Sequence, residues 1–128
     1  MTQEINATTY DFPKHLVVPT TLTTNKITTS PTALVDTGAT SSFINHRFVT
    51  KHNLPTRPRE PKLPIRDIDG RPLGTIDQEV IAKLRVGSHQ EEIALDVAPT
   101  GNHPLVLGLP WLQRHNPSID FTDNRITF

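Results

Sequence analysis

A chain of 128 residues has the length of one compact domain with a single core. Its formal net charge is zero and its sequence pI is about 7.0, so no overall positive field favours binding to nucleic acid or to a membrane surface. The absence of cysteine excludes disulfides, thiolate metal ligands and cysteine nucleophiles, and it fits a reducing compartment.

The start of the chain has neither the basic cluster nor the apolar segment of a signal peptide, and no window reaches the length of a membrane span. We therefore expect a soluble, intracellular protein with no membrane partner. Residues 1–15 are expected to form an N-terminal extension, and residues 16–128 the folded domain. Twelve prolines, many threonines and only six glycines are typical of many short extended segments, which predicts a mainly β fold.

Four stretches of the sequence predict strands. Residues 15–24 and 26–36 are rich in β-branched side chains and are expected to pair antiparallel across a turn near Asn25 and Lys26. Asp69-Gly70, within residues 65–76, is a dipeptide that favours a hairpin turn. Residues 75–99 read as two more strands that turn at Gly87-Ser88, and the apolar residues of 118–128 indicate a final strand-like segment.

Two short helices are expected between these strands. One covers residues 43–53, with Ser41 or Ser42 as its cap, and the other covers residues 109–117, with Pro110 at its first position.

Residues 54–64 are rich in proline and in basic side chains, which predicts an extended, solvated loop. The basic residues of this region leave a nucleic-acid-associated role open as a third and weaker hypothesis. Neutral net charge and the lack of interleaved aromatic residues argue against that role. The four basic residues concerned are Arg57, Arg59, Lys62 and Arg66.

The segment "TALVDTGATSSFI" carries one aspartate from an apolar strand directly into Thr37-Gly38. This arrangement suits an acid presented at a tight turn, where Gly38 lets another backbone approach closely. Taken alone, the tripeptide is explained more often by an Asx turn or a helix cap.

Three segments together are more specific than the tripeptide. "LVDTGATSSFI", "DIDGRPLG" and "LVLGLPWLQRHNPSIDF" resemble, in order and spacing, the retropepsin-like aspartic proteases, and most closely the protease of Ty3/gypsy long-terminal-repeat retrotransposons. The resemblance extends from about Leu16 to Phe128. It implies a closed, barrel-like β subunit with a flap hairpin and one or two short helices, which works as a homodimer.

The resemblance also implies residue roles. Among the eight aspartates only Asp36 precedes Thr-Gly, so one chain supplies one catalytic carboxylate and a symmetric dimer supplies two. Such a pair shares one proton, so one acid acts as general base on a water while the other donates to the scissile carbonyl. The implied catalytic residues are Asp36, Thr37 and Gly38. The implied substrate-binding residues are Gly38, Ala39, Thr40, Ile68, Asp69, Gly70 and Val106, with Leu107 and Gly108 supporting the site.

Three departures from the retroviral pattern stand out. Thr40 occupies the place of a second acidic residue, Leu109 replaces the arginine that follows the glycine, and the tip of the flap is not glycine-rich. These differences fit the retrotransposon branch, or the DNA-damage-inducible ubiquitin-receptor proteases, better than the retroviral enzymes.

The sequence therefore predicts an aspartic endopeptidase that cuts extended peptide segments in the polyprotein of its own element, in the cytoplasm or within virus-like particles. The alternative is a catalytically silent, domesticated protease fold that acts as a dimerisation or peptide-binding module. Six histidines show no pair three or four residues apart, so no metal site and no cofactor are expected.

Overall fold

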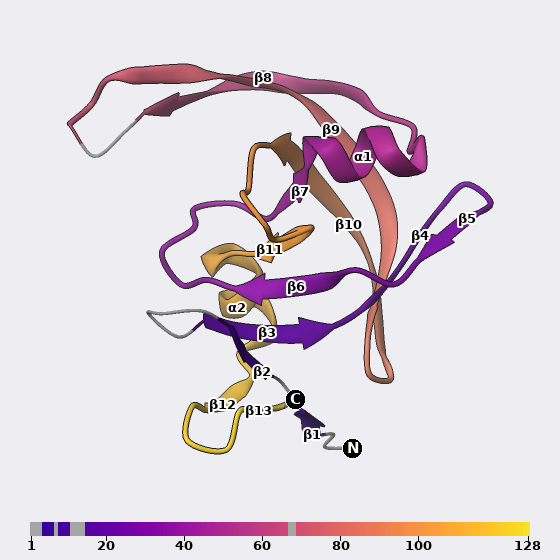
Figure 1. The fold of residues 1–128 in the computed structure, drawn as a ribbon, viewed down its shortest axis with the longest axis vertical. Coiled ribbons are helices and arrows are strands. Elements are labelled where there is room, and N and C mark those ends of the chain that lie inside the picture. The colour runs from indigo at the N-terminus through magenta and orange to yellow at the C-terminus, as the bar shows by residue number, and fades with distance from the viewer. Residues whose placement is uncertain (1–3, 7, 11–14, 67–68) are drawn as a thin grey trace.

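The structure is a computed structural model that describes residues 4–6, 8–10, 15–66 and 69–128. Within these residues the chain forms two sheets and two short helices, α1 (His46–His52) and α2 (Leu109–His115) (Figure 1). The strands are β1 (Glu4–Asn6), β2 (Thr8–Tyr10), β3 (His15–Pro19), β4 (Thr21–Thr24), β5 (Ile27–Thr29), β6 (Thr32–Val35), β7 (Phe43–Asn45), β8 (Arg57–Arg66), β9 (Pro72–Val86), β10 (His89–Ala98), β11 (Leu105–Leu107), β12 (Ser118–Asp120) and β13 (Arg125–Thr127). The mainly β class predicted from composition is confirmed.

The larger sheet brings two distant segments of the chain together. Its strand order is β2-β3-β6-β11-β7-β10-β9-β4-β5, and β8 pairs with β9 outside this path. Strand β11 lies between β6 and β7, parallel to β6 and antiparallel to β7. Because Leu107 pairs with Val35, the residues that follow β6 and β11 emerge at the same end of the sheet.

The turns predicted from local residue chemistry are confirmed. Strands β4 and β5 meet at Asn25, whose φ is 53°, and β3 pairs with β6. Strands β8 and β9 form a hairpin whose turn includes Gly70, with φ 84°. Strands β9 and β10 turn at Gly87, with φ 63°. Asparagine and glycine accept positive φ more readily than other residues, so these turns are encoded locally.

Residues 57–66 form strand β8, so the prediction of a loop over residues 54–64 is wrong. Among the described strands β8 pairs only with β9, which makes it an edge strand with one open side. Proline lacks the N–H that an inner strand would need, and an edge strand tolerates that loss. The pairing register shifts between Pro58 and Leu63, a stretch that includes Pro61.

Residues 43–45 form strand β7, so the predicted helix over residues 43–53 begins too early. The residues of β7 pair with both β10 and β11, and this tertiary pairing overrides the helical pattern. Helix α1 starts at His46. Its cap is Asn45, rather than Ser41 or Ser42, and the Asn45 side chain accepts hydrogen bonds from backbone N–H groups of the first turn. Helix α2 is confirmed, with Pro110 in its first turn.

Strand β1 near the start of the chain and the last two strands form a separate three-stranded sheet in the order β1-β13-β12 (Figure 1). Residues 118–128 thus contain two strands joined by a turn, where the sequence predicted one strand-like segment. Strand β13 is central, Ile126 is fully buried, and the outer strands are β1 and β12. Residues 4–6 therefore belong to this sheet and residues 8–10 to the larger one, and the domain boundary at residue 15 stays a prediction.

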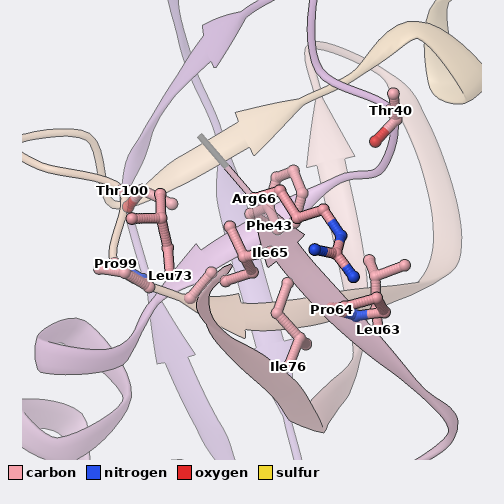
Figure 2. A pocket seen from close by; sticks show the side chains of 11 residues that line it. Thr40, Phe43, Leu63, Pro64, Ile65, Arg66, Leu73, Ile76, Pro99 and Thr100 are labelled. Atoms are coloured by element: carbon pink, nitrogen blue, oxygen red, sulfur yellow. The ribbon is translucent and has the colours of Figure 1, made fainter. Parts of the chain in front are cut away.

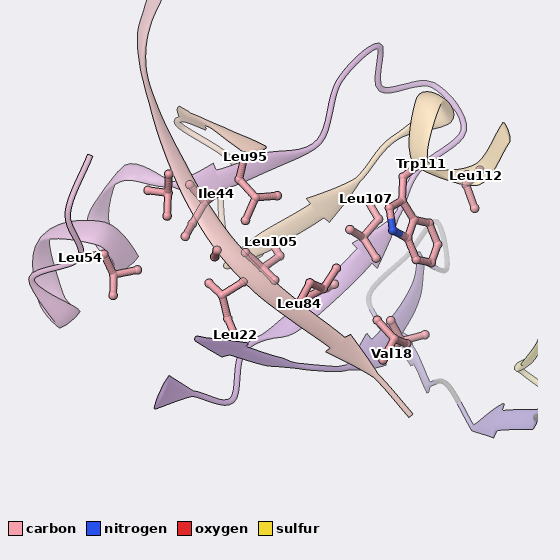
Figure 3. Packing of buried hydrophobic residues seen from close by; sticks show 14 of the residues in the cluster. Val18, Leu22, Ile44, Leu54, Leu84, Leu95, Leu105, Leu107, Trp111 and Leu112 are labelled. Carbon is pink, nitrogen blue, oxygen red and sulfur yellow. The ribbon is translucent and has the colours of Figure 1, made fainter. Parts of the chain in front are cut away.

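The curled large sheet encloses the apolar core. Figure 3 shows Leu22, Leu84 and Leu105, which come from three different strands, packed in one cluster with Trp111 of α2. Burial of each leucine contributes roughly 1.5–3 kcal/mol. A smaller cluster of Val17, Leu34 and Val106 contacts Ala39 and Phe43. Neither helix in the described part of the chain is long and apolar enough to cross a membrane.

Candidate active site

Asp36 lies where β6 ends and the loop of residues 36–42 begins. Its backbone N–H donates to the Leu107 carbonyl (3.0 Å), and its Oδ1 accepts from the Gly38 N–H (2.8 Å). The Ala39 N–H donates to the Asp36 carbonyl (3.2 Å). Asp36 is half-buried, while Thr37 and Gly38 are exposed. The Asx-type bond that the tripeptide favours is present, and it fixes a carboxylate that still reaches solvent and can act as a general base.

Gly108 forms the floor of this loop. A Cβ atom at this position would lie 2.1 Å from the Ser41 carbonyl oxygen and 2.8 Å from that of Ala39. The Gly108 N–H donates to Ser42 Oγ (3.1 Å), and the Leu109 N–H donates to the Ala39 carbonyl (2.8 Å). Gly108 has φ −90°, so its requirement for glycine comes from this close approach and not from an unusual backbone angle.

A buried carboxylate that the sequence prediction missed ties the loop to the flap hairpin β8–β9. The Asp96 side chain, 6% exposed, accepts from Arg59 Nε at Oδ1 (2.7 Å) and from Ser41 Oγ at Oδ2 (2.7 Å). The Asp96 N–H donates to the Ser42 carbonyl (3.0 Å). Arg59 belongs to β8, so the Asp96 side chain links three segments: β8, β10 and the Asp36 loop. The available sequence signal was an acid within the apolar run "IALDVA" of β10.

A cavity of about 370 Å³ lies between the flap hairpin and the residues that follow the Asp36 loop (Figure 2). Ile65 and Leu73 of the hairpin line it together with Phe43, Pro99 and Thr100. The lining is largely apolar, and Leu73 is 64% exposed. A partly apolar groove beside a strand hairpin suits an extended peptide, whose backbone can add to the strands while its side chains enter pockets.

The predicted substrate-binding residues fall in different environments. Thr40 lines the cavity, and the preceding residue, Ala39, is half-buried. Asp69 and Gly70 are exposed in the turn of the hairpin and do not line the cavity, although the Gly70 carbonyl accepts from Arg66, which does. Val106 is buried, with 6% exposure, in the smaller core cluster. Ile68 lies outside the described residues. The functional roles of these residues stay predictions.

Several basic residues of strand β8 have partners within the chain. Arg57 Nε pairs with Glu79 (2.8 Å), Arg59 pairs with Asp96, and Arg66 Nη1 donates to the Gly70 carbonyl (3.2 Å). Carboxylates therefore pair with two of the four basic residues on which the nucleic-acid hypothesis depended, and Arg66 contacts a neutral carbonyl.

Comparison with known proteins matches residues 32–128 to the family described as the PEG10/RTL1 protease domain. The solved structure of a retropepsin-like aspartic protease from Rickettsia conorii is similar, with a TM-score of 0.63 and 16% identity, over 99% of this chain and 90% of that chain. EIAV protease complexed with the inhibitor HBY-793 is similar with a TM-score of 0.60 and 16% identity, over 88% of this chain and 99% of that chain. These likenesses show a retropepsin-like fold, as the sequence predicted.

Proposed function

Because the chain belongs to the PEG10/RTL1 protease domain family, we propose that it is an aspartic endopeptidase whose active form is a homodimer. The observation that carries the proposal is the construction of the Asp36 turn. Two backbone hydrogen bonds, an Asx-type bond and the close approach of Gly108 fix one accessible carboxylate at the end of the sheet. Pre-organisation of this kind is what an acid–base catalyst requires.

The mechanism needs a second carboxylate, and Asp36 of a second subunit would supply it. Two carboxylates that face each other cannot both ionise cheaply, so the pair holds one proton. The ionised Asp36 removes a proton from a water as the water attacks the peptide carbonyl. The protonated one donates to the carbonyl oxygen, which yields a tetrahedral diol without an acyl-enzyme. Thr37 and Gly38 are the proposed supports of this geometry.

Substrate would bind as an extended peptide between the loop and the flap hairpin. Ile65 and Leu73 contribute apolar surface from the flap, and Thr40 and Phe43 contribute further lining. Closure of the hairpin over the peptide would expel water from the site. The contacts of Asp96 with Arg59 and with Ser41 join strand β8 of the flap hairpin to the Asp36 loop.

The terminal sheet is the proposed dimer contact. Its outer strands β1 and β12 each present an edge, and an edge pairs readily with another chain. Phe121 is 69% exposed in the turn between β12 and β13, and Leu109 is 39% exposed at the start of α2. Apolar side chains in these positions favour burial against a second copy.

The substrate is proposed to be the polyprotein of a Ty3/gypsy-type element, and the location to be intracellular, which the cysteine-free sequence suits. The competing function is a domesticated module that dimerises or binds peptides without cleaving them. The intact Asp36-Thr37-Gly38 triplet favours the enzyme.

Asp36→Asn tests the proposal, with Asp77→Asn as a matched control in an exposed position of β9. An amide cannot act as a base, so peptide cleavage by Asp36→Asn should fall by at least about 100-fold, while circular dichroism stays unchanged. Asp77→Asn should retain wild-type cleavage. If the purified Asp36→Asn protein keeps most of the activity, the mechanism is wrong. If the wild-type dimer binds extended peptides without cutting any of them, the module is the better description.

A further inference from the structure

A cluster of two histidines and one glutamate lies where β10 begins and α2 ends. His89 and Glu91 are two residues apart on β10, so their side chains lie on the same face, and His115 is the last residue of α2. His89 Nε2 is 3.1 Å from Glu91 Oε2, and His115 Nε2 lies against the same oxygen. One potential metal-ligand atom from each residue falls within 4.8 Å of the others.

The surroundings hold this cluster in place. Side-chain exposure is 26% for His89, 8% for Glu91 and 13% for His115. Trp111 Nε1 donates to Glu91 Oε1 (2.6 Å), which leaves Oε2 to face the two imidazoles. The Phe128 ring stacks on His89, with centroids 5.2 Å apart. In proteins, a hydrogen bond to the second oxygen commonly fixes the orientation of a metal-binding carboxylate.

The cluster has one group that the protein leaves unsatisfied. His115 Nε2 is buried and lacks a hydrogen bond of acceptable geometry. Two imidazole nitrogens therefore converge on a single carboxylate oxygen, and only one of them forms a well-shaped contact with it. A cation placed between the three atoms would accept a lone pair from each, so it would satisfy both imidazoles and the carboxylate together.

We propose that His89, Glu91 and His115 form a binding site for a divalent transition-metal ion, and that Zn²⁺ fits it best. Two imidazoles and one carboxylate with a water as fourth ligand are a ligand set that Zn²⁺ accepts. Bonds of about 2.0–2.1 Å to nitrogen in tetrahedral geometry separate ligand atoms by roughly 3.3 Å, which is close to the His89–Glu91 spacing. His115 Nε2 lies closer than this to Glu91 Oε2, so the His115 ring would move back to admit the ion. His89, whose side chain is 26% exposed, gives the ion access from solvent.

The ion would have a structural role that does not depend on peptide cleavage. Bound there, it would join the last residue of α2 to the start of β10. Helix α2 begins directly after Gly108, the floor of the Asp36 loop, so the ion would brace the helix that anchors this floor. Sequence spacing gave no hint of the site, because its ligands combine a strand pair two residues apart with a distant helix end.

Metal titration tests the site directly. The chain should first be dialysed against chelator and carry Asp36→Asn, so that paired catalytic carboxylates cannot supply the binding site. Calorimetric titration with ZnCl₂ should then show one ion per chain. Trp111 is the only tryptophan, so its fluorescence should change over the same titration, and the melting temperature should rise with Zn²⁺. Mg²⁺, which prefers oxygen ligands, should produce none of these effects.

Two ligand variants and one control complete the test. His89→Gln and His115→Gln should each weaken Zn²⁺ binding by roughly tenfold or more. His46→Gln changes an exposed histidine on α1 and should bind Zn²⁺ as the parent does. Failure of the parent to bind Zn²⁺ at micromolar concentrations would overturn the proposal. Equal affinity in His89→Gln and the parent would also overturn it, and this partly exposed position keeps the test decisive if His115→Gln does not fold.

Discussion

Gly108→Ala isolates the contact between the Asp36 loop and the end of β11. The added methyl would meet two backbone carbonyl oxygens, from Ser41 at 2.1 Å and from Ala39 at 2.8 Å, as well as the Ser41 carbonyl carbon at 2.8 Å. These are backbone atoms, which cannot swing aside as a flexible side chain would. The loop must therefore move away from Gly108.

The cost follows from the clash and from the hydrogen bonds that cross this contact. Overpacking alone costs about 1–3 kcal/mol. Displacement of the loop also strains the bonds from Gly108 N–H to Ser42 Oγ and from Leu109 N–H to the Ala39 carbonyl, each contributing about 0.5–1.5 kcal/mol. We expect a loss of about 3 kcal/mol in the free energy of unfolding. With an m-value of about 2 kcal/mol/M in urea, the midpoint should fall by about 1.5 M.

Urea denaturation followed by Trp111 fluorescence measures this loss, at one protein concentration for all variants so that oligomerisation does not shift the midpoint. Gly70→Ala is the matched control. A methyl at Gly70 meets nothing within 4 Å, but φ there is 84°, so the substitution carries only a conformational cost of about 1–2 kcal/mol. If Gly108→Ala is no less stable than Gly70→Ala, the close approach beneath Asp36 is wrong.

Three further outcomes are expected. Asp96→Asn should lower the free energy of unfolding by about 1–3 kcal/mol because it leaves Arg59 without its buried partner, whereas Glu79→Gln breaks an exposed ion pair and should cost less than about 1 kcal/mol. Deletion of residues 122–128 removes the buried Ile126 and should yield a less stable, monomeric and inactive chain in sedimentation and cleavage assays. The cleavage rate of wild type should rise and fall with pH, since the proposed pair of Asp36 carboxylates would need one proton and would lose function with two or none.

A specific result would contradict each of these three predictions. Equal urea midpoints for Asp96→Asn and Glu79→Gln would show that the link between β8 and the Asp36 loop contributes no more stability than the Arg57–Glu79 ion pair. A truncated chain that sediments as a dimer and cuts peptide would move the interface elsewhere. A rate that does not vary with pH while the dimer stays intact would contradict a shared proton.

Elements that depend on local chemistry were predictable from the sequence. The turns at Asn25, Gly70 and Gly87 need residues that accept positive φ, and the sequence supplies them at those positions. Helix α2 follows from Pro110 near its start and Asn116 after its end. The fold itself was predictable because the segments around Asp36 and Gly108 occur together, and the structure joins them through β6 and β11.

Elements that depend on distant partners were not predictable. Phe43 has a helical spacing of apolar neighbours, yet it pairs with Asp96 of β10 and Val106 of β11. The prolines of β8 indicated a loop because the edge position that tolerates them is visible only in the assembled sheet. Asp96 was missed for a related reason, since its partners Arg59 and Ser41 lie 37 and 55 residues away.

The position of β11 also governs when the Asp36 turn can form during synthesis. Strands β6 and β7 do not pair with each other, because β11 occupies the place between them. A nascent chain that has not yet released residues 105–108 from the ribosome has neither the Leu107 carbonyl that holds Asp36 nor the glycine beneath its loop. Non-local pairing of this kind closes late in folding. A polypeptide with this topology therefore cannot complete the Asp36 turn until residues 105–108 are free to pair with β6.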